Sequence, residues 1–231
     1  MNTRMPPVDP GFFDQPPLRL AVALLGKLVC RRVEDVWLAC RIIETEAYYI
    51  DEKGSHSSLG RTPSREAMFM PAGTIYMYYS RGKPSLNVSA RGEGNAVLIK
   101  SGVAETRQPE ALALMRAGLG RDKPEETLCS GQTLLCQALH LAVEDWRGRQ
   151  FDPEVFYIGD DGYRPEQVVQ TARLGIAPQR DAHLPYRFVD AAFARRATQN
   201  PMKRTAVAGR DYRIMPLETA LKLKEEHGHG H

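Results

Sequence analysis

The sequence predicts an α+β protein, a single domain built on a curved, mainly antiparallel sheet with surrounding helices. Short runs of β-branched and aromatic residues, separated by brief glycine-containing or acidic turns, fill much of the first hundred positions and indicate neighbouring strands. Other segments space their apolar residues as helices do. No segment repeats and no low-complexity linker interrupts the 231 residues, so we expect one domain over 11–226, a flexible N-terminus over 1–10 and a disordered His/Gly tail over 227–231.

The first half of the chain reads as two helices and two groups of strands that are joined by tight turns. Helical spacing of apolar residues predicts a helix from Pro17 to Lys27, with Gly26 near its end. Thr62 and Pro63 are typical of an N-cap and first helical position, and predict a short helix to about Phe69. The expected strands are Leu28 to Val33, Val36 to Ala47, Thr74 to Tyr79, Ser85 to Ala90 and Ala96 to Lys100.

The second half of the chain mixes the two kinds of element. Apolar spacing predicts helices over 108–117, 131–141 and 216–226. Two short apolar runs, 155–158 and 186–189, read as strands. These elements complete the single α+β domain.

The composition is that of an ordinary soluble globular protein, with 42% hydrophobic and 26% charged residues. No apolar run approaches the roughly 20 residues that span a membrane, and the N-terminus has no basic start followed by an apolar stretch. None of the four cysteines forms a CxxC pair or lies beside a histidine at zinc-ligand spacing. We therefore expect a cytoplasmic protein, nucleoid-associated if bacterial, with reduced cysteines and no structural zinc.

Basic residues gather towards the end of the chain. Positions 171–213 hold nine Arg or Lys against three Asp, a net charge of +6, whereas the whole chain carries +3. Such a concentration suggests a polyanion such as nucleic acid, and a solvated basic face would produce the same pattern.

The segment RIIETEAY, residues 41–48, places two acidic residues and a tyrosine on one predicted strand. Strand alternation would place Ile42, Glu44, Glu46 and Tyr48 on one face. Carboxylates two positions apart on a strand are about 7 Å apart, a separation that glycosidases use, although an exposed strand pairing its acids with Lys or Arg has the same spacing. Tyrosines in or beside the strands could stack an unpaired base or fill the core, and they occupy positions 48, 49, 76, 78 and 79.

His56 lies in a small polar loop, where a surface residue and a ligand contact are both reasonable interpretations. With Ser55 and Asp51 it would allow a Ser-His-Asp hydrolase. No GxSxG motif accompanies these residues, so we discount that interpretation.

Several motifs resemble the alkyladenine (3-methyladenine) DNA glycosylase family, which excises alkylated and deaminated purines. The resemblance begins with RIIETEAY and continues through the HS pair of the following loop into GRTPSREAMFMPAGTIYMY at 60–78. It spans about residues 11–190. Further matching motifs are LLGK at 24–27, CSG at 129–131, LCQAL at 135–139, RLGI at 173–176 and PYRF at 185–188.

The resemblance implies roles for the residues of the reaction. Glu46 would be the general base that deprotonates the attacking water, and the carbonyl of Leu174 would accept a hydrogen bond from that water. Lys100 stands where the family has an arginine that helps to hold the water. Glu44 would then be structural.

The resemblance also implies a base-binding pocket. Tyr48, His56 and Tyr78 correspond to walls that sandwich a flipped base, and Asn87 corresponds to an asparagine near the purine edge. This pocket would need no metal and no organic cofactor.

DNA contacts are expected at Arg81, Lys83, Arg61 and Arg173. Arg81 stands where the family usually has a tyrosine wedge, and the hairpin is one residue shorter than usual. A flat guanidinium can enter the minor groove, so Arg81 is our candidate plug for the space left by the flipped nucleotide.

The sequence thus predicts a monomeric, monofunctional purine DNA glycosylase that acts on double-stranded DNA containing damaged purines and leaves an abasic site. An alternative is a catalytically weak or inactive damaged-DNA binding protein of the same fold, which the changes at Arg81 and Lys100 would favour. A glycosidase acting on free nucleosides is disfavoured by the basic segment 171–213.

Overall fold

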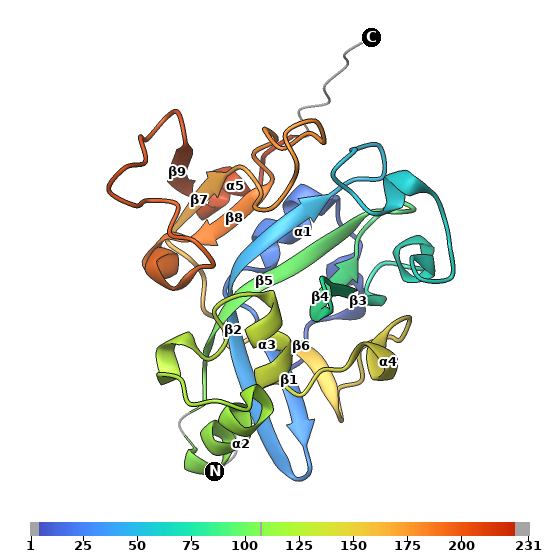
Figure 1. Cartoon of the computed structure of the whole chain (residues 1–231), viewed down its shortest axis with the longest axis vertical. Helices are drawn as coiled ribbons and strands as arrows, with labels where there is room; N and C mark the ends of the chain where they lie inside the picture. Colours follow the sequence, from blue (N-terminus) through green and yellow to red (C-terminus); the bar gives the residue numbers. More distant parts are fainter. Residues whose placement is uncertain (1–4, 107, 225–231) are drawn as a thin grey trace.

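The computed structural model describes residues 5–106 and 108–224, in which helices surround one antiparallel sheet (Figure 1). Nine strands of these residues form the sheet. They are β1 (Leu28–Val33), β2 (Val36–Tyr48), β3 (Ile75–Ser80), β4 (Lys83–Ser89), β5 (Ala96–Ala104), β6 (Phe156–Gly159), β7 (Gln167–Thr171), β8 (Arg187–Asp190) and β9 (Tyr212–Pro216).

The strand order is β3-β4-β5-β2-β8-β7-β9, and β1 pairs with both β2 and β6. Every ladder between these strands is antiparallel. The predicted α+β class, with an antiparallel sheet and surrounding helices, is confirmed. β2 lies at the centre of this order, which places its acidic residues between β5 and β8.

The α-helices are short, and 3-10 turns supplement them. The α-helices are α1 (Pro17–Leu24), α2 (Pro109–Leu119), α3 (Gln132–Ala138), α4 (Val143–Trp146) and α5 (Leu217–Ala220). The 3-10 helices are η1 (Pro10–Phe13), η2 (Ser57–Leu59), η3 (Glu66–Phe69), η4 (Glu125–Thr127) and η5 (Ala191–Arg196). No helix of the described residues is long and apolar enough to cross a membrane.

Several elements differ from the sequence-based expectation. The first helix ends at Leu24 because the chain turns at Gly26, whose φ is +85°. The short helix expected to begin at Thr62 forms only as η3, and β7 and β9 were not predicted. The closing helix is reduced to α5, and its expected end lies outside the described residues, as does the 227–231 tail.

The start of the described chain packs against β6. The amide of Val8 donates to the carbonyl of Ile158 at 2.9 Å, and the amide of Asp160 donates to the carbonyl of Pro6 at 2.9 Å. Residues 5–10, which the sequence predicts to be flexible, therefore lie along the edge of the sheet. Residues 1–4 lie outside the described part.

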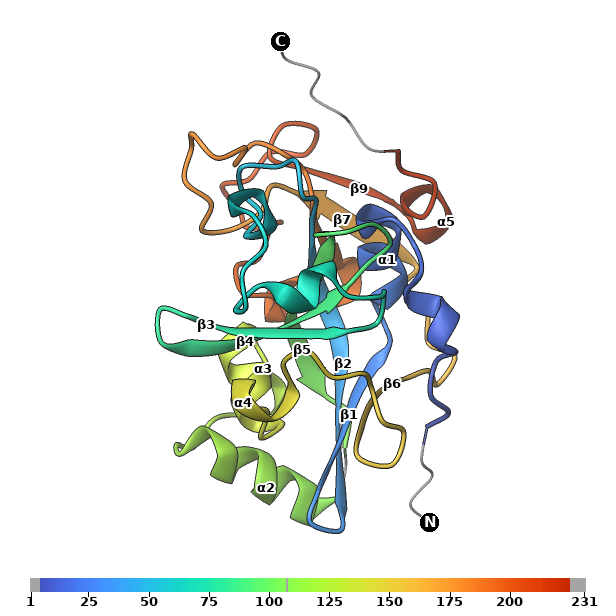
Figure 2. The ribbon, with the colours of Figure 1, turned by 90° about the vertical axis from the view of Figure 1, so that its right-hand side faces the viewer.

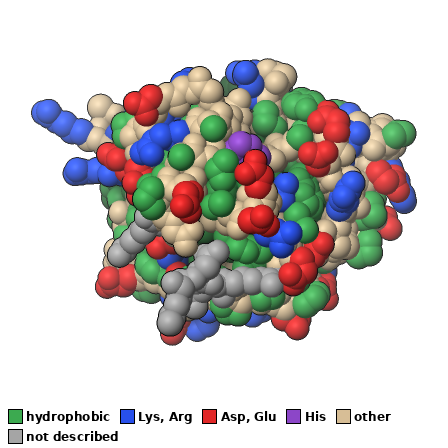
Figure 3. Space-filling model, turned by 90° about the horizontal axis from the view of Figure 1, so that it is seen from below, with side chains coloured by type: hydrophobic (Ala, Val, Ile, Leu, Met, Phe, Trp, Pro, Cys, Tyr) green, Lys and Arg blue, Asp and Glu red, His purple; other side chains and the backbone are tan. Residues whose placement is uncertain are grey.

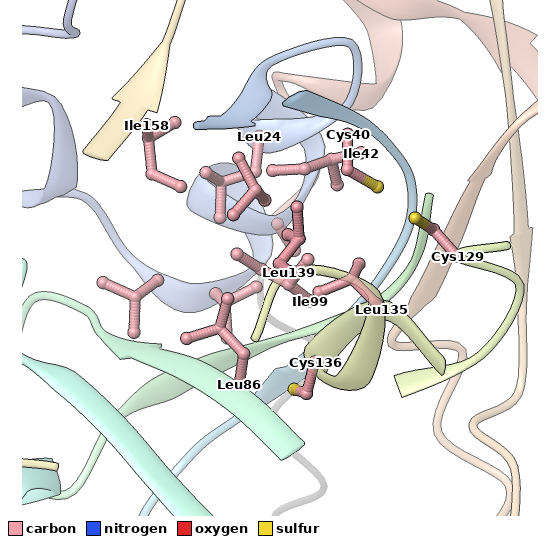
Figure 4. Packing of buried hydrophobic residues seen from close by; sticks show 14 of the residues in the cluster. Leu24, Cys40, Ile42, Leu86, Ile99, Cys129, Leu135, Cys136, Leu139 and Ile158 are labelled. Carbon is pink, nitrogen blue, oxygen red and sulfur yellow. The ribbon is translucent and has the colours of Figure 1, made fainter. Parts of the chain in front are cut away.

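The main hydrophobic core joins helices and strands from distant parts of the sequence (Figure 4). Leu24 of α1, Ile42 of β2 and Leu86 of β4 converge with Leu135 of α3 and Ile158 of β6. All five side chains are at most 1% exposed, so removing any of them would leave a cavity. This core fixes the strands that carry the polar residues described below.

A bulge in β2 separates its apolar half from its acidic half. Ile42 pairs with Gly102 and Glu44 pairs with Ser101, so Ile43 is an extra residue on β2. Because neighbouring residues on β5 point to opposite faces, Ile42 and Glu44 do so too. The predicted face is therefore wrong for Ile42, which packs into the main core, and the two acids share the other face.

A second bulge lies on β5 one step further along. Glu44 pairs with Ser101 but Thr45 pairs with Ile99, so Lys100 is an extra residue on β5. The two bulges offset each other, and the strands pair regularly from Thr45 onwards. The second bulge directs the Lys100 side chain towards Glu46.

The β3–β4 hairpin projects from the body of the molecule (Figure 2). Ser80 pairs with Lys83, which leaves a two-residue turn of Arg81 and Gly82. Their φ values are +50° and +74°, as a type I′ turn requires. This turn is tighter than the gap between Tyr79 and Ser85 that the predicted strands leave.

Candidate active site

A cavity of about 540 Å³ lies against β3, β4 and β5, within the range of small-molecule sites. The loop after β2, the N-terminal end of α3 and residues 174–180 complete its walls. Most of the predicted site residues line it. These are Tyr48, His56, Tyr78, Arg81, Lys83, Asn87, Lys100 and Leu174.

Glu46 lies directly beneath this lining and is fully buried. Its Oε1 accepts a hydrogen bond from the Leu174 amide at 3.1 Å and pairs with Lys100 Nζ at 3.0 Å. Its Oε2 accepts a hydrogen bond from the Tyr48 hydroxyl at 2.7 Å. Three neighbours that line the cavity thus fix the orientation of one carboxylate.

Tyr48 remains a neutral donor to this carboxylate at ordinary pH. Burial is the largest cause, and the Glu46 carboxylate the next, of a pKa of Tyr48 well above its usual range. The phenol therefore keeps its proton and can donate it to Glu46 in a hydrogen bond.

Aromatic rings form one wall of the cavity. The ring centroids of His56 and Tyr78 are 4.3 Å apart, and those of Tyr76 and Tyr78 are 5.3 Å apart in a stacked arrangement. The sequence offered Tyr76 only as one of five tyrosines that could stack a base or fill the core, and assigned it no role in the site. Its position two residues before Tyr78 on β3, and so on the same face, is the signal that would have found it.

His56 is held in place by a hydrogen bond between its Nδ1 and the Tyr76 hydroxyl at 3.1 Å. Burial, followed by the nearby Arg65 and Arg180, lowers the pKa of His56 below its usual 6.5. The ring is therefore neutral at physiological pH. A neutral imidazole adds no positive charge to the wall of the cavity.

Asn87 is 4% exposed and lines the cavity from β4. Its Nδ2 donates to the carbonyl of Tyr76 at 3.1 Å, which fixes the amide group. A fixed amide can distinguish ligands by the hydrogen bonds they offer.

Cationic side chains also line the cavity. Arg81 and Lys83 come from the hairpin, and Arg180, which was not predicted, comes from the loop after β7. By contrast, the face seen in Figure 3 intermixes acidic and basic side chains. Arg61 is exposed and pairs with Glu66, and it is not part of the lining.

Arg173 does not fit the DNA contact that the sequence predicts. Its side chain is fully buried, and it pairs with Glu52 and donates from Nη1 to the carbonyl of Ala47 at 2.8 Å. Its guanidinium carbon lies 4.6 Å from the centroid of the Tyr48 ring. Arg173 therefore supports the pocket from behind.

Glu44 is fully buried and acts as a structural carboxylate. Arg187 Nε donates to its Oε1 at 2.6 Å, and its Oε2 accepts hydrogen bonds from the amide and hydroxyl of Thr198 at 2.8 and 2.9 Å. Thr198 itself lines the cavity, so Glu44 fixes a wall that sequence reasoning did not identify. No local motif around Thr198 signals this long-range contact.

Ion pairs within the protein account for part of the basic segment 171–213. Arg173 and Arg187 are buried, and Arg196 and Arg210 pair at the surface. The four pairs are Arg173–Glu52, Arg187–Glu44, Arg196–Glu126 and Arg210–Asp211. The charge of this segment is therefore partly structural.

The site combines an aromatic cavity, cationic side chains in its lining and a buried carboxylate held by three donors. Such a cavity can stack a planar ring, and the carboxylate can take a proton from a water molecule. Within the described residues, no three His, Cys, Asp or Glu side chains come together as a metal site.

Known proteins are similar to this sequence over most of its length. The sequence model of the methylpurine-DNA glycosylase family matches residues 11–193. A protein of Pseudomonas aeruginosa, named a candidate 3-methyladenine DNA glycosylase, is 53% identical over 216 residues, which cover 90% of each chain. A protein of Pseudomonas fluorescens with the same name is 52% identical, and the match covers 93% of this chain and 96% of the Pseudomonas fluorescens chain.

A more distant relative comes from an animal. The DNA-3-methyladenine glycosylase of Mus musculus is 39% identical over 181 residues, which cover 73% of this chain and 54% of the mouse protein. Together with the family match, these identities confirm the resemblance read from the sequence motifs. The chain belongs to the methylpurine-DNA glycosylase family and is a DNA glycosylase.

Proposed function

We propose that this protein flips alkylated or deaminated purines out of duplex DNA and hydrolyses their N-glycosidic bond with a water molecule activated by Glu46. The observation that carries the proposal is the buried Glu46 carboxylate beneath an aromatic cavity. Relatives named for 3-methyladenine support the choice of a damaged purine as substrate.

Base flipping follows from the position of the bond to be broken. A duplex hides the glycosidic bond, and a damaged or mispaired nucleotide costs less to extrude than a normal one. Tyr48, His56 and Tyr78 would then hold the extruded base between their rings. A purine alkylated at N3 or N7 carries positive charge, which favours contact with aromatic faces.

The contacts of Glu46 suit water activation. In the proposed step the water oxygen attacks C1′ of the sugar, Glu46 takes the proton, and the base leaves with the electrons of the broken bond. Leu174 donates its amide to Glu46, so its carbonyl remains our candidate acceptor for the water. Lys100 and Tyr48 orient the carboxylate from its two oxygens.

Lys100 would not act as a nucleophile. Its ammonium pairs with Glu46 at 3.0 Å and its side chain is 9% exposed, whereas attack on C1′ needs a free amine. We therefore expect an abasic site in an intact strand. Borohydride should therefore trap no covalent protein–DNA adduct. An adduct that is trapped in the wild type and absent in Lys100→Arg would show that Lys100 is a nucleophile.

DNA binding would use the cations of the cavity lining. Arg81 and Lys83 are exposed on the projecting hairpin, and Arg61 remains a candidate contact outside the lining. Phosphate contacts make affinity fall as salt rises, so binding to a lesion duplex should weaken steeply between low and physiological salt. One chain carries the whole cavity, so we expect the protein to act as a monomer, which sedimentation would test.

The decisive experiment replaces the proposed base without changing its size. Glu46→Gln should lower single-turnover release of hypoxanthine or 3-methyladenine at least about 100-fold, while binding of the lesion duplex persists. Glu34→Gln, an identical change in the exposed β1–β2 turn, is the matched control and should act like the wild type. Release that continues at the wild-type rate in Glu46→Gln would remove Glu46 from the mechanism.

A further inference from the structure

Behind the cavity lies a buried ion pair that the proposed reaction does not use. Arg173, in the loop after β7, and Glu52, in the loop after β2, pair through Nη2 and Oε2. They are 4% and 6% exposed, and neither lines the cavity. A buried pair at this location places charge beside the pocket without direct access to a ligand.

The guanidinium of Arg173 lies against a wall of the base-binding cavity. Its carbon atom is 4.6 Å from the centroid of the Tyr48 ring and 5.5 Å from that of Tyr186. Tyr48 lines the cavity and Arg173 does not, so the cation occupies the protein side of that ring. A Cβ added to Gly54, another lining residue, would lie 3.0 Å from Arg173 Nη2, which places the cation just below the surface.

A cation at this position affects what the Tyr48 ring can bind. Aromatic faces attract cations through their negative potential, and a guanidinium on one side opposes a second positive charge on the other. Glu52 supplies the negative charge that offsets Arg173. A neutral base would be nearly insensitive to this balance, whereas a cationic base would respond to it directly.

We propose that Arg173 and Glu52 are specificity-determining residues, which set the preference of the pocket between cationic and neutral damaged purines through the net charge behind Tyr48. This inference rests on the proposed function. It concerns the ratio of two activities of the same site, and not the presence of activity.

The surroundings of Glu52 make this balance sensitive. Burial, the largest effect, raises the pKa of Glu52 to about 7, and it outweighs the opposing effects of Arg173 and of the Tyr49 amide, which donates to Oε1 at 2.9 Å. Asp51 raises it further. The charge that offsets Arg173 is therefore only partly present near neutral pH.

Two single variants change the charge behind Tyr48 in opposite directions, and the double variant returns the net charge to that of the wild type. Single-turnover release of 3-methyladenine, a cation in DNA, and of hypoxanthine, which is neutral, would be measured at one pH. Glu52→Gln leaves Arg173 unopposed and should lower the ratio of the 3-methyladenine rate to the hypoxanthine rate about tenfold. Arg173→Gln removes the cation and should raise the ratio, and the double variant should restore it to within about twofold of the wild type.

A purely structural role predicts a different pattern. Loss of pocket shape would slow both releases together and would not be reversed in the double variant, and far-UV circular dichroism would show which variants fold. Shifts of the ratio in the same direction for both single variants, or no shift beyond twofold in either, would overturn the proposal. If the wild type releases neither base, the proposed function fails first, which is a separate result.

Discussion

At the scale of single residues, two glutamates six positions apart have different surroundings. Glu46 receives two hydrogen bonds and an ion pair from groups around the cavity, whereas Glu52 pairs with the buried Arg173 and accepts the Tyr49 amide. The sequence motif predicts a special role for Glu46. Nothing near Glu52 predicts its partner, because Arg173 is more than a hundred residues away along the chain.

The raised pKa of Glu52 predicts a pH-dependent contribution to stability. Its pKa rises from 4.5 to about 7 on folding, so the folded protein binds more protons between these values. The contribution is complete below about pH 4.5 and is lost as pH rises through 7. Between pH 5 and pH 8, the free energy of unfolding of the wild type should fall by about 2 kcal/mol relative to that of Glu52→Gln. Urea unfolding at the two pH values measures this difference, and parallel pH profiles would contradict the assignment.

At the scale of elements, the longer strands were easier to predict than the short ones and than the face on which each side chain lies. Alternating β-branched and aromatic residues identify β1 to β5, but β7 is short with polar residues at both ends, and β9 is short, largely exposed and ends at a proline. The face assignment of β2 assumed unbroken alternation, and the bulge at Ile43 breaks it. Bulges depend on contacts with neighbouring strands, so a single strand's sequence does not reveal them.

The β3–β4 turn separates stability from DNA binding. Arg81 has φ +50°, a conformation that Asn adopts more readily, and Asn-Gly is the favoured pair for a type I′ turn. Arg81→Asn should therefore raise the free energy of unfolding by up to about 1 kcal/mol. The same change removes the candidate plug and should weaken lesion binding about tenfold, while the release rate from the bound state changes less.

Arg81→Lys is the matched control for that prediction, because it keeps the charge and removes the planar group. Fluorescence anisotropy with lesion-containing and undamaged duplexes would separate the effect of the charge from the effect of the planar guanidinium on DNA affinity. Equal lesion affinity for the wild type and Arg81→Asn would show that another residue fills the gap, with Lys83 the next candidate.

At the scale of the whole molecule, the segment after residue 193 completes the site. The family match ends there, but Thr198 lines the cavity and is bound by Glu44 of β2. Arg187 joins the same network, since its Nη2 donates to the carbonyl of Gln199 at 2.7 Å. The central strand β2 thus carries both Glu46, the candidate base, and Glu44, which anchors the C-terminal segment.

Glu44→Gln should loosen this anchor. The change leaves Arg187 buried without its counter-charge, so the free energy of unfolding should fall by about 3 kcal/mol. Limited trypsin digestion should cut faster at Lys203 and Arg204, which follow the anchored residues. Glu126→Gln removes the exposed partner of Arg196 in the same region and should change stability by less than about 0.5 kcal/mol. Equal effects of the two variants would show that the buried network does not hold the segment.

The two neighbouring bulges on β2 and β5 show where these strands could lose a residue and keep their pairing. Deleting Ile43 would leave Ile42 and Glu44 as neighbours opposite Gly102 and Ser101, and deleting Lys100 would leave Ile99 and Ser101 as neighbours opposite Thr45 and Glu44. The side chains on either side would keep their faces in both cases. Only the second deletion would remove the ion-pair partner of Glu46, so the pairing of the strands does not require Lys100, whereas the proposed site does.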